Sequence, residues 1–202
     1  MGRFKAMEES GELDGRTLRA DARKNRKNLL DVAREAFAEG GPEAPLEEIA
    51  RRAGVGIGTL YRHFPSRIEL IEAMYSEQIE GLIELAHRLS ETKHSGEAFF
   101  SWLRAETETM ISFRAIKVYL MSSDAQRRSA AHVWKDRLTE AAGLLLRNAQ
   151  AAGAVRKGID TAGVLSLVHG VITAAEASTE REKTRARQLL DVVIDGLKAD
   201  TR

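Results

Sequence analysis

The sequence contains no cysteine, which excludes disulfide bonds, catalytic thiolates and zinc sites built on cysteine. It also lacks any apolar run close to the ~20 residues that a membrane span requires. The first residues are charged and carry no apolar core, so the pattern of a secretory signal peptide is missing. We therefore expect a cytoplasmic protein that does not contact a membrane.

An excess of one charge is missing as well, because the formal net charge is only +1 over 202 residues. The bases are nevertheless unevenly distributed. Six bases and one acid lie between Arg16 and Lys27, and four arginines plus one histidine lie without any acid between Arg51 and Arg67. Phosphate binding depends on the charge of one face rather than on the total. Such runs also fit solvated helix faces, which is the simpler interpretation for the first run taken alone.

Apolar residues recur at helical spacing along most of the chain, and no β-alternation of useful length appears. Residues 1–20 lack this spacing and contain three glycines, so they are expected to form a flexible basic tail. The sequence thus predicts an all-α fold, with one long helix joining an N-terminal head to a second helical domain. Helices are predicted at about 21–39, 45–53, 57–64, 66–89, 97–113, 115–121, 127–151, 161–177 and 181–199.

Residues 46–75 have the pattern of two short helices joined by a turn that contains glycine. Gly54 can adopt the left-handed conformation that ends the first helix. Pro65 stops the second helix, and Ser66 with Glu69 forms a capping box that opens the next one. Two short helices with such a turn are the build of a helix-turn-helix DNA reader.

The second of these helices carries residues that suit the major groove. Gly56 and Gly58 keep its first turn slim, so that backbone N–H groups can approach a phosphate. Arg62 can fork onto a guanine, and Thr59 can place its methyl group against a thymine. Taken singly, each feature also fits an ordinary role, such as a glycine loop, a core tyrosine or a surface histidine. The remaining polar side chains, which can donate to phosphates, are Tyr61, His63 and Arg67.

The order of these residues is more specific than any one of them. The run Gly-Thr-Leu-Tyr-Arg-His-Phe-Pro, preceded by Ala-Arg-Arg-Ala-Gly-Val, resembles the signature of TetR-family transcriptional regulators over about residues 22–75. This resemblance implies a three-helix DNA-binding domain at 21–75. At 76–202 it implies an all-helical domain that binds an effector and dimerises. The contacts expected with double-stranded DNA are made by Arg23, Gly56, Gly58, Thr59, Tyr61, Arg62, His63 and Arg67.

The chain departs from the family pattern at two places. Ala44 and Pro45 stand where many members carry threonine or serine at the start of the second helix, which removes a side-chain cap and a phosphate contact. Gly56 stands where serine often follows the turn, which removes another hydroxyl. The basic run Arg16–Lys27 is expected to compensate, so deletion of residues 1–20 should weaken DNA binding and flatten its salt dependence.

In the regulators that this chain resembles, the last two long helices form the dimer interface, and here they correspond to about 161–177 and 181–199. Both segments are apolar on more than one face, which requires partners beyond a single core; a monomeric core of the same helices is the alternative. The resemblance also implies an effector pocket, for which we expect an uncharged or weakly charged small molecule. The candidate lining residues, which also suit an ordinary core, are Phe99, Trp102, Met110, Phe113, Tyr119, Met121, Trp134 and His169.

Enzymatic function is the main alternative. Glu84 and His87, with Glu91 and His94, form two Glu-x-x-His pairs like half of a di-iron carboxylate site, but that site needs the pairs on separate helices. No other catalytic or metal-binding motif is found, so we predict no catalytic residue, no metal and no cofactor. An adaptor that kept the fold without DNA binding and a transcriptional activator are further alternatives. The interpretation we favour is a homodimeric repressor that a small-molecule effector releases from a palindromic operator.

Overall fold

The computed structural model describes residues 2–92, 94–122, 125–174 and 179–199; for residues 2–20, 121–122 and 125–133 the description is limited to the backbone. Within these ranges the chain is helical except for turns and one isolated antiparallel bridge between Val155 and Lys198. It divides into two compact units, Met1–Met74 and Tyr75–Arg202. The prediction of an all-α fold is confirmed.

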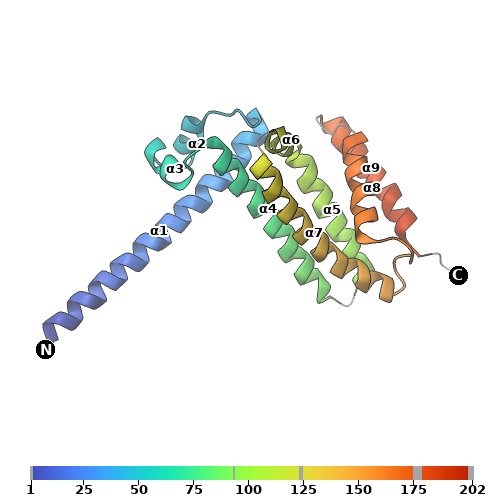
Figure 1. The fold of residues 1–202 in the computed structure, drawn as a ribbon, viewed down its shortest axis with the longest axis horizontal. Helices are drawn as coiled ribbons and strands as arrows, with labels where there is room; N and C mark the ends of the chain where they lie inside the picture. Colours follow the sequence, from blue (N-terminus) through green and yellow to red (C-terminus); the bar gives the residue numbers. More distant parts are fainter. Residues whose placement is uncertain (1, 93, 123–124, 175–178, 200–202) are drawn as a thin grey trace. The chain divides into compact units, whose positions relative to one another are not determined.

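The first unit contains α1 (Gly2–Gly40), α2 (Leu46–Arg52), α3 (Ile57–His63) and the beginning of α4 (Arg67–Ser90) (Figure 1). Gly41, at φ +72°, follows the end of α1, and its N–H donates to the carbonyl oxygen of Phe37 at 2.9 Å. The small core between these helices is formed by apolar residues at helical spacing, among them Leu29, Ala33, Phe37, Ile49, Leu60, Phe64 and Leu70.

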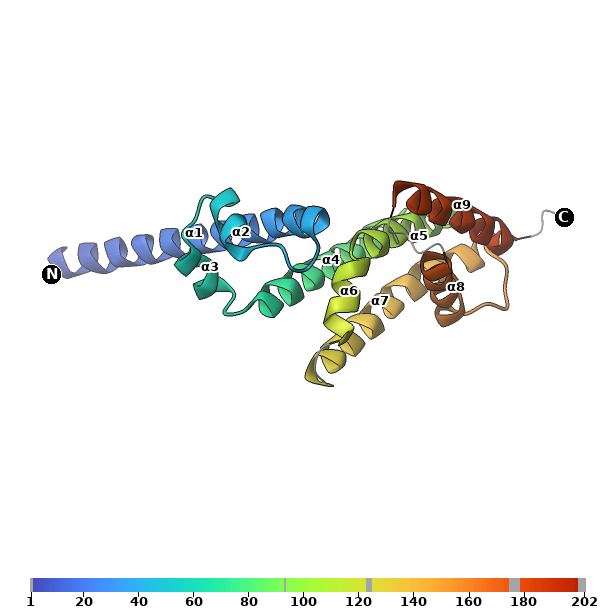
Figure 2. The same cartoon turned by 90° about the horizontal axis from the view of Figure 1, so that it is seen from above.

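The second unit contains the rest of α4 and the helices α5 (Ser95–Ser112), α6 (Arg114–Ser122), α7 (Ala125–Ala151), α8 (Thr161–Ala174) and α9 (Glu180–Leu197). Helix α5 is central, because it packs against α7, α8 and α9 (Figures 1 and 2). Trp102 of α5 is fully buried and donates its indole N–H to the carbonyl oxygen of Leu82 on α4 at 2.9 Å. Arg137 of α7 forms a forked ion pair with Glu80 of α4. These contacts tie α4 to the centre of the second unit.

Helix α1 begins much earlier than predicted, at Gly2 instead of near Asp21. Apolar periodicity reports burial, and a segment rich in good helix formers such as Glu, Arg and Ala can be helical without a buried stripe. The flexibility of residues 1–20 stays a prediction.

The C-terminal helices lie close to their predicted ranges. Helix α8 ends at Ala174 within the described residues, and positions 175–177, predicted as its last turn, lie outside them. Helix α9 is opened by a capping box, in which the Thr179 hydroxyl accepts from the N–H of Glu182 at 3.3 Å and the Glu182 carboxylate accepts from the N–H of Thr179 at 2.8 Å.

Candidate functional site

A Schellman motif forms the turn between α2 and α3. The N–H of Val55 donates to the carbonyl oxygen of Ala50 at 3.0 Å, and the N–H of Gly54 donates to that of Arg51 at 3.1 Å. Gly54 has φ +69°, a left-handed conformation that strongly favours glycine. The turn is therefore the one predicted from Gly54, and it fixes the direction in which α3 leaves α2.

Helix α3 has one apolar and one open face. Leu60 and Phe64, four positions apart on the same side, are buried in the core. Tyr61 is 45% exposed, and Arg62 is exposed beside it without a hydrogen bond or ion pair to any described residue. A large aromatic ring left at the surface next to an arginine is available to a ligand.

The glycines of this segment leave its first turn slim. A Cβ atom added at Gly56 or Gly58 would meet open space, so no neighbour in the described chain requires glycine there. Thr59 and His63 are half-buried at the edge of the open face, and Arg23 of α1 is exposed. The residues expected from the sequence to contact DNA are thus present on the first unit, and their contacts with DNA stay predictions.

Two side chains of α1 hold the helix-turn-helix segment in place. Asn28 donates through Nδ2 to the carbonyl oxygen of Ala53, at the end of α2, at 2.8 Å. The guanidinium group of Arg26 lies 5.1 Å from the centre of the Phe64 ring, within the range of a cation–π contact. Arg26 belongs to the first basic run, so part of that run has a structural role.

Arg67 also has a structural role that the sequence did not reveal. Its Nη1 donates to the carbonyl oxygens of Pro42 at 3.0 Å and Ala44 at 2.5 Å. The guanidinium group thereby holds the loop that leads into α2. This loop contains the Ala44 position where a hydroxyl is missing, and Pro45, the N-cap of α2, makes no side-chain cap. Arg67 positions backbone here, and its predicted phosphate contact stays untested.

Two arginines of the second basic run, Arg51 and Arg52, are paired with acidic side chains. Arg51 forms a forked pair with Glu48, and Arg52 pairs with both Glu48 and Glu39, the latter at 2.9 Å. Hydrogen bonds from Arg51 and Arg52 lower the pKa of Glu48 to about 2. The two arginines are thus largely neutralised by acids just outside the run, and the positive charge of the open face comes from elsewhere.

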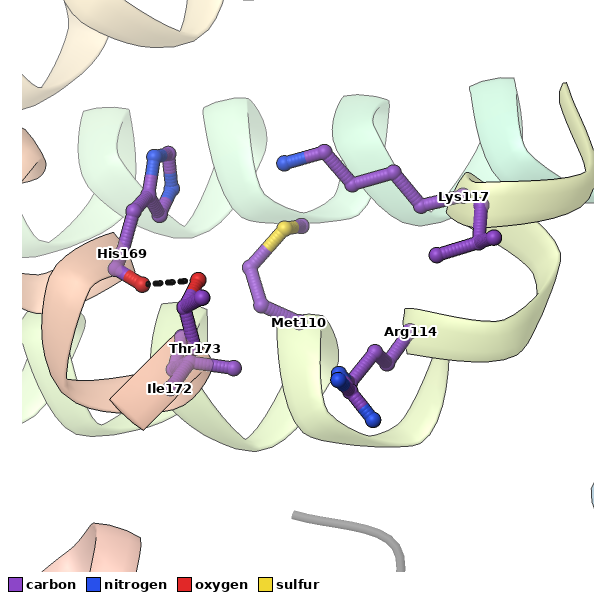
Figure 3. Close-up of a pocket in the computed structure, with 7 residues that line it drawn as sticks. Met110, Arg114, Lys117, His169, Ile172 and Thr173 are labelled. Carbon is purple, nitrogen blue, oxygen red and sulfur yellow. Dashed lines mark hydrogen bonds between the residues drawn. The ribbon is translucent and has the colours of Figure 1, made fainter. Parts of the chain in front are cut away.

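A pocket with a cavity volume of about 440 Å³ lies in the second unit, between α5, α6 and α8 (Figure 3). Figure 3 shows Lys117 and His169 reaching into the same space from opposite sides, with Met110 between them. The hydroxyl of Thr173 donates to the carbonyl oxygen of His169 at 2.9 Å. The lining consists of Met110, Arg114, Lys117, Val118, His169, Ile172 and Thr173.

A buried carboxylate supports one wall of this pocket. Glu106 is fully buried, and its Oε1 lies 2.8 Å from Nε2 of His169. Its Oε2 has no hydrogen-bond partner among the described residues. Burial raises the pKa of Tyr75 to about 12, and the charge of Glu106 adds to that shift. Tyr75 lies on α4, so Glu106 acts electrostatically on α4 and bonds directly to the pocket wall.

Two of the predicted pocket residues, Met110 and His169, line this pocket. Three others, Phe99, Trp102 and Phe113, are buried in the core. The rings of Phe113 and Trp134 pack around Tyr75, with centroids at 6.3 and 5.3 Å. Tyr119 is half-buried, and the side chain of Met121 lies outside the described residues.

The pocket cations and Glu106 were missed in the sequence. Arg114 and Lys117 are three residues apart in a short helix, which places both charges on one side. Glu106 interrupts a run of buried residues at helical spacing on α5, between Trp102 and Met110. An acid in an apolar stripe is a signal for a buried polar contact.

Two hydrophobic side chains of α8 and α9 are exposed, and a third is half-buried. Leu167 is 48% and Val192 68% exposed, and Val193 is half-buried. Leu167 and Val193 line a common hollow. Exposed apolar side chains gathered in this way are typical of a surface that binds another protein.

The di-iron alternative has no structural support in the described residues. Glu84, His87, Glu91 and His94 are all exposed. Nowhere in the described ranges do three or more His, Cys, Asp or Glu side chains gather as metal ligands would. The same residues also contain no helix with the length and apolar run needed to cross a bilayer.

Comparison with known proteins identifies both units. The family described as bacterial regulatory proteins, tetR family, matches residues 29–74. The family described as transcriptional regulator SbtR-like, C-terminal domain, matches residues 94–199. The HTH-type transcriptional regulator UidR of Escherichia coli K12 is 27% identical over 188 residues, which cover 89% of this chain and 96% of UidR.

Solved structures agree over nearly the whole chain. A TetR transcription regulatory protein from Mycobacterium vanbaalenii is 32% identical, with a TM-score of 0.72, and the match covers 90% of this chain and 99% of that one. A TetR transcriptional regulator from Streptomyces coelicolor is 30% identical, also with a TM-score of 0.72, over 87% of this chain and 99% of that one. The chain therefore belongs to the TetR family of bacterial transcriptional regulators, which are DNA-binding proteins and not enzymes, as its signature motif predicted.

Proposed function

We propose that this regulator is a homodimeric repressor that binds a palindromic operator and is released from it by a small-molecule effector. The observation that carries the proposal is the open face of α3, where slim glycines precede an exposed tyrosine and arginine on a rigidly held helix. A helix with such a face enters the major groove of B-DNA without obstruction.

The contacts differ in what they contribute to DNA binding. Arg62 reads a base, because its exposed guanidinium group has no described partner and suits the two acceptors of a guanine. The backbone at Gly56 and Gly58 approaches the sugar–phosphate chain, as do Tyr61 and His63. Thr59 contacts a thymine methyl group. The peripheral contacts from Arg23 and Arg67 go to phosphates, which add affinity without sequence preference.

Dimerisation uses the open apolar surface of α8 and α9. Leu167, Val192 and Val193 would be covered by the same residues of a second copy in a two-fold interface. A dimer places two copies of α3 on successive major grooves of one face of DNA, which is why the operator should be palindromic.

Release by an effector works through α4, which is continuous across the boundary of the two units. His169 on the pocket wall bonds to Glu106, whose charge acts on Tyr75 of α4. Phe113, the residue before Arg114 of the pocket, packs on the same tyrosine ring. A ligand that binds one arrangement of this cluster more tightly shifts α4 and thereby the spacing of the two reading heads.

The test is a footprint of the purified protein on DNA flanking its own gene, with unrelated DNA beside it, across a salt series. A protected palindrome that persists as salt rises supports the proposal. Equal binding to both DNAs would favour a regulator of distant targets, and no binding at low salt would favour an adaptor that kept only the fold. A reporter gene placed behind the protected site then separates a repressor from an activator by the sign of the change.

A further inference from the structure

The lining of the effector pocket is basic on one side. Arg114 and Lys117 of α6 both belong to it, and none of its described lining residues is acidic. The side-chain ammonium group of Lys117 makes no hydrogen bond or ion pair with any described residue. In Figure 3 its ammonium group reaches across the space toward His169. A lysine that points into a hollow without a partner is suited to bind an anion.

Glu106 supports the wall of this pocket from behind, and it does not bond to Lys117. Its carboxylate is fully buried and lies behind the imidazole of His169. A ligand in the pocket therefore meets the imidazole edge before it meets the carboxylate. The Lys117 ammonium group reaches into the open space, whereas the Glu106 carboxylate lies buried behind the pocket wall.

The rest of the wall is apolar. Met110 and Ile172 are buried side chains that form its floor, and Val118 is 61% exposed at its rim. A volume of about 440 Å³ lies within the usual size of small-molecule sites. An exposed valine beside two cations fits a ligand with an apolar body and one acidic end.

We infer that the effector is an organic anion whose acidic group pairs with Lys117 and whose apolar body lies against Met110, Val118 and Ile172. This inference rests on the proposed effector function of the pocket. It departs from the uncharged or weakly charged effector expected from the sequence, because only the fold brings Arg114 and Lys117 to the pocket wall.

The test compares carboxylic acids with their own primary amides. Phenylbutanoic, octanoic and naphthoic acid, each beside its amide, would be titrated into the full-length protein by isothermal calorimetry at neutral pH. At least one acid should bind, and its amide should bind roughly tenfold or more weakly, as expected for the loss of a charge-assisted contact. Amides that bind as tightly as the acids, or a panel in which no acid binds, would overturn the inference.

Variants assign the effect to this pocket. Lys117→Met keeps the apolar stem and removes the charge, so it should weaken acid binding about tenfold and leave amide binding unchanged. Lys117→Arg should retain acid binding. The matched control is Lys135→Met, an exposed lysine of α7 outside the pocket, which should change neither. Equal loss in the control and in Lys117→Met would also overturn the inference.

The operator footprint keeps the two proposals apart. If the protein protects a palindrome but binds no acid, the inference about the effector is wrong and the proposed regulatory function still stands. Acid binding that depends on Lys117 without any effect on DNA protection would support the ligand class and contradict release by that ligand.

Discussion

Two arginines only five positions apart have different environments. Arg62 on α3 is exposed and makes no described contact, whereas Arg67 at the start of α4 holds the carbonyl oxygens of Pro42 and Ala44. The sequence alone predicts DNA contacts for both arginines, because it shows their charge but not the groups to which they donate. Their substitutions should therefore separate specificity from stability.

Arg62→Ala should leave the fold unchanged and cost about 1–3 kcal/mol of operator binding, with relaxed preference at one base position. The measurement is a set of operator variants, each with one substituted base pair, titrated with both proteins. A uniform loss across all operators would instead place Arg62 on a phosphate.

Arg67→Met should destabilise the protein in the absence of DNA, because the carbonyl groups of Pro42 and Ala44, in part-buried contacts, lose a charged donor. The expected cost is about 1–3 kcal/mol in urea unfolding. If Arg67 also binds a phosphate, the slope of log affinity against log salt should fall by roughly 1. Unchanged stability with a reduced slope would show that the phosphate contact is its main role.

At the scale of elements, the turn between α2 and α3 and the start of α3 use glycine for different reasons. Gly54 needs its left-handed φ of +69°, although space for a side chain exists there. Gly58 has an ordinary helical backbone and equally open space. The two glycines provide a matched pair of substitutions.

Gly54→Ala should lower stability by roughly 1–2 kcal/mol, the cost of a left-handed alanine. Gly58→Ala should preserve stability or raise it by up to about 1 kcal/mol, since alanine favours helix, yet weaken operator binding by placing a methyl group in the groove. Thermal unfolding and DNA titration of both variants test this. A Gly58→Ala protein that binds DNA normally would show that the groove does not need glycine there.

The elements could be predicted where their signals are local. Gly54, Pro65 and the Ser66–Glu69 capping box mark α2, α3 and α4 within a few residues. The early start of α1 was missed because residues 2–20 lack apolar periodicity, and good helix formers can be helical without it. The ion pairs of Arg51 and Arg52 with Glu48, and the hydrogen bonds of Arg67 to the loop before α2, depend on distances in the folded chain. The sequence alone does not give these distances.

The residues that line the pocket were the hardest to predict, because packing decides which side chains surround an empty space. Aromatic residues such as Phe99 and Trp102 are large, so they fill the core and leave no room for a ligand. Space remains where shorter or flexible side chains such as Met110, Lys117 and Thr173 meet from three helices. Which side chains meet is decided by packing between segments far apart in the chain.

At the scale of the whole molecule, the cluster around Tyr75 should connect effector and DNA. Tyr75→Leu removes the ring contacts with Phe113 and Trp134 and the phenol near Glu106. Effector affinity and effector-free DNA affinity should both stay within about threefold of the original, while the effector-dependent change of DNA affinity, of order 1–3 kcal/mol in such proteins, should fall by at least half. Unchanged release would exclude this route.

The stability of the chain should fall in acid. The folded-state pKa of Glu48 is about 2, below its value in an unfolded chain, so the unfolded state binds more protons once the pH drops below about 4.5. The contribution of this group is present above that pH and is lost as the pH falls toward 2. Bonds to arginine or lysine likewise lower the pKa of Glu80, Glu108 and Glu180.

Urea unfolding at pH 3 and pH 6 tests this expectation. Glu48→Gln should lose less stability between the two pH values than the original protein, and Glu47→Gln, an exposed neighbour without a described ion pair, should lose as much as the original. An equal loss in all three proteins would show that Glu48 does not contribute.

Glu106 has a consequence for the history of this chain. A fully buried carboxylate whose Oε2 has no hydrogen-bond partner among the described residues lowers the stability of the fold, and an apolar side chain of similar size would pack there at less cost. Populations selected only for heat tolerance should therefore lose this acid early, together with the response to the effector. A lineage that keeps this acid under selection for heat tolerance would show that regulation outweighs stability at this position.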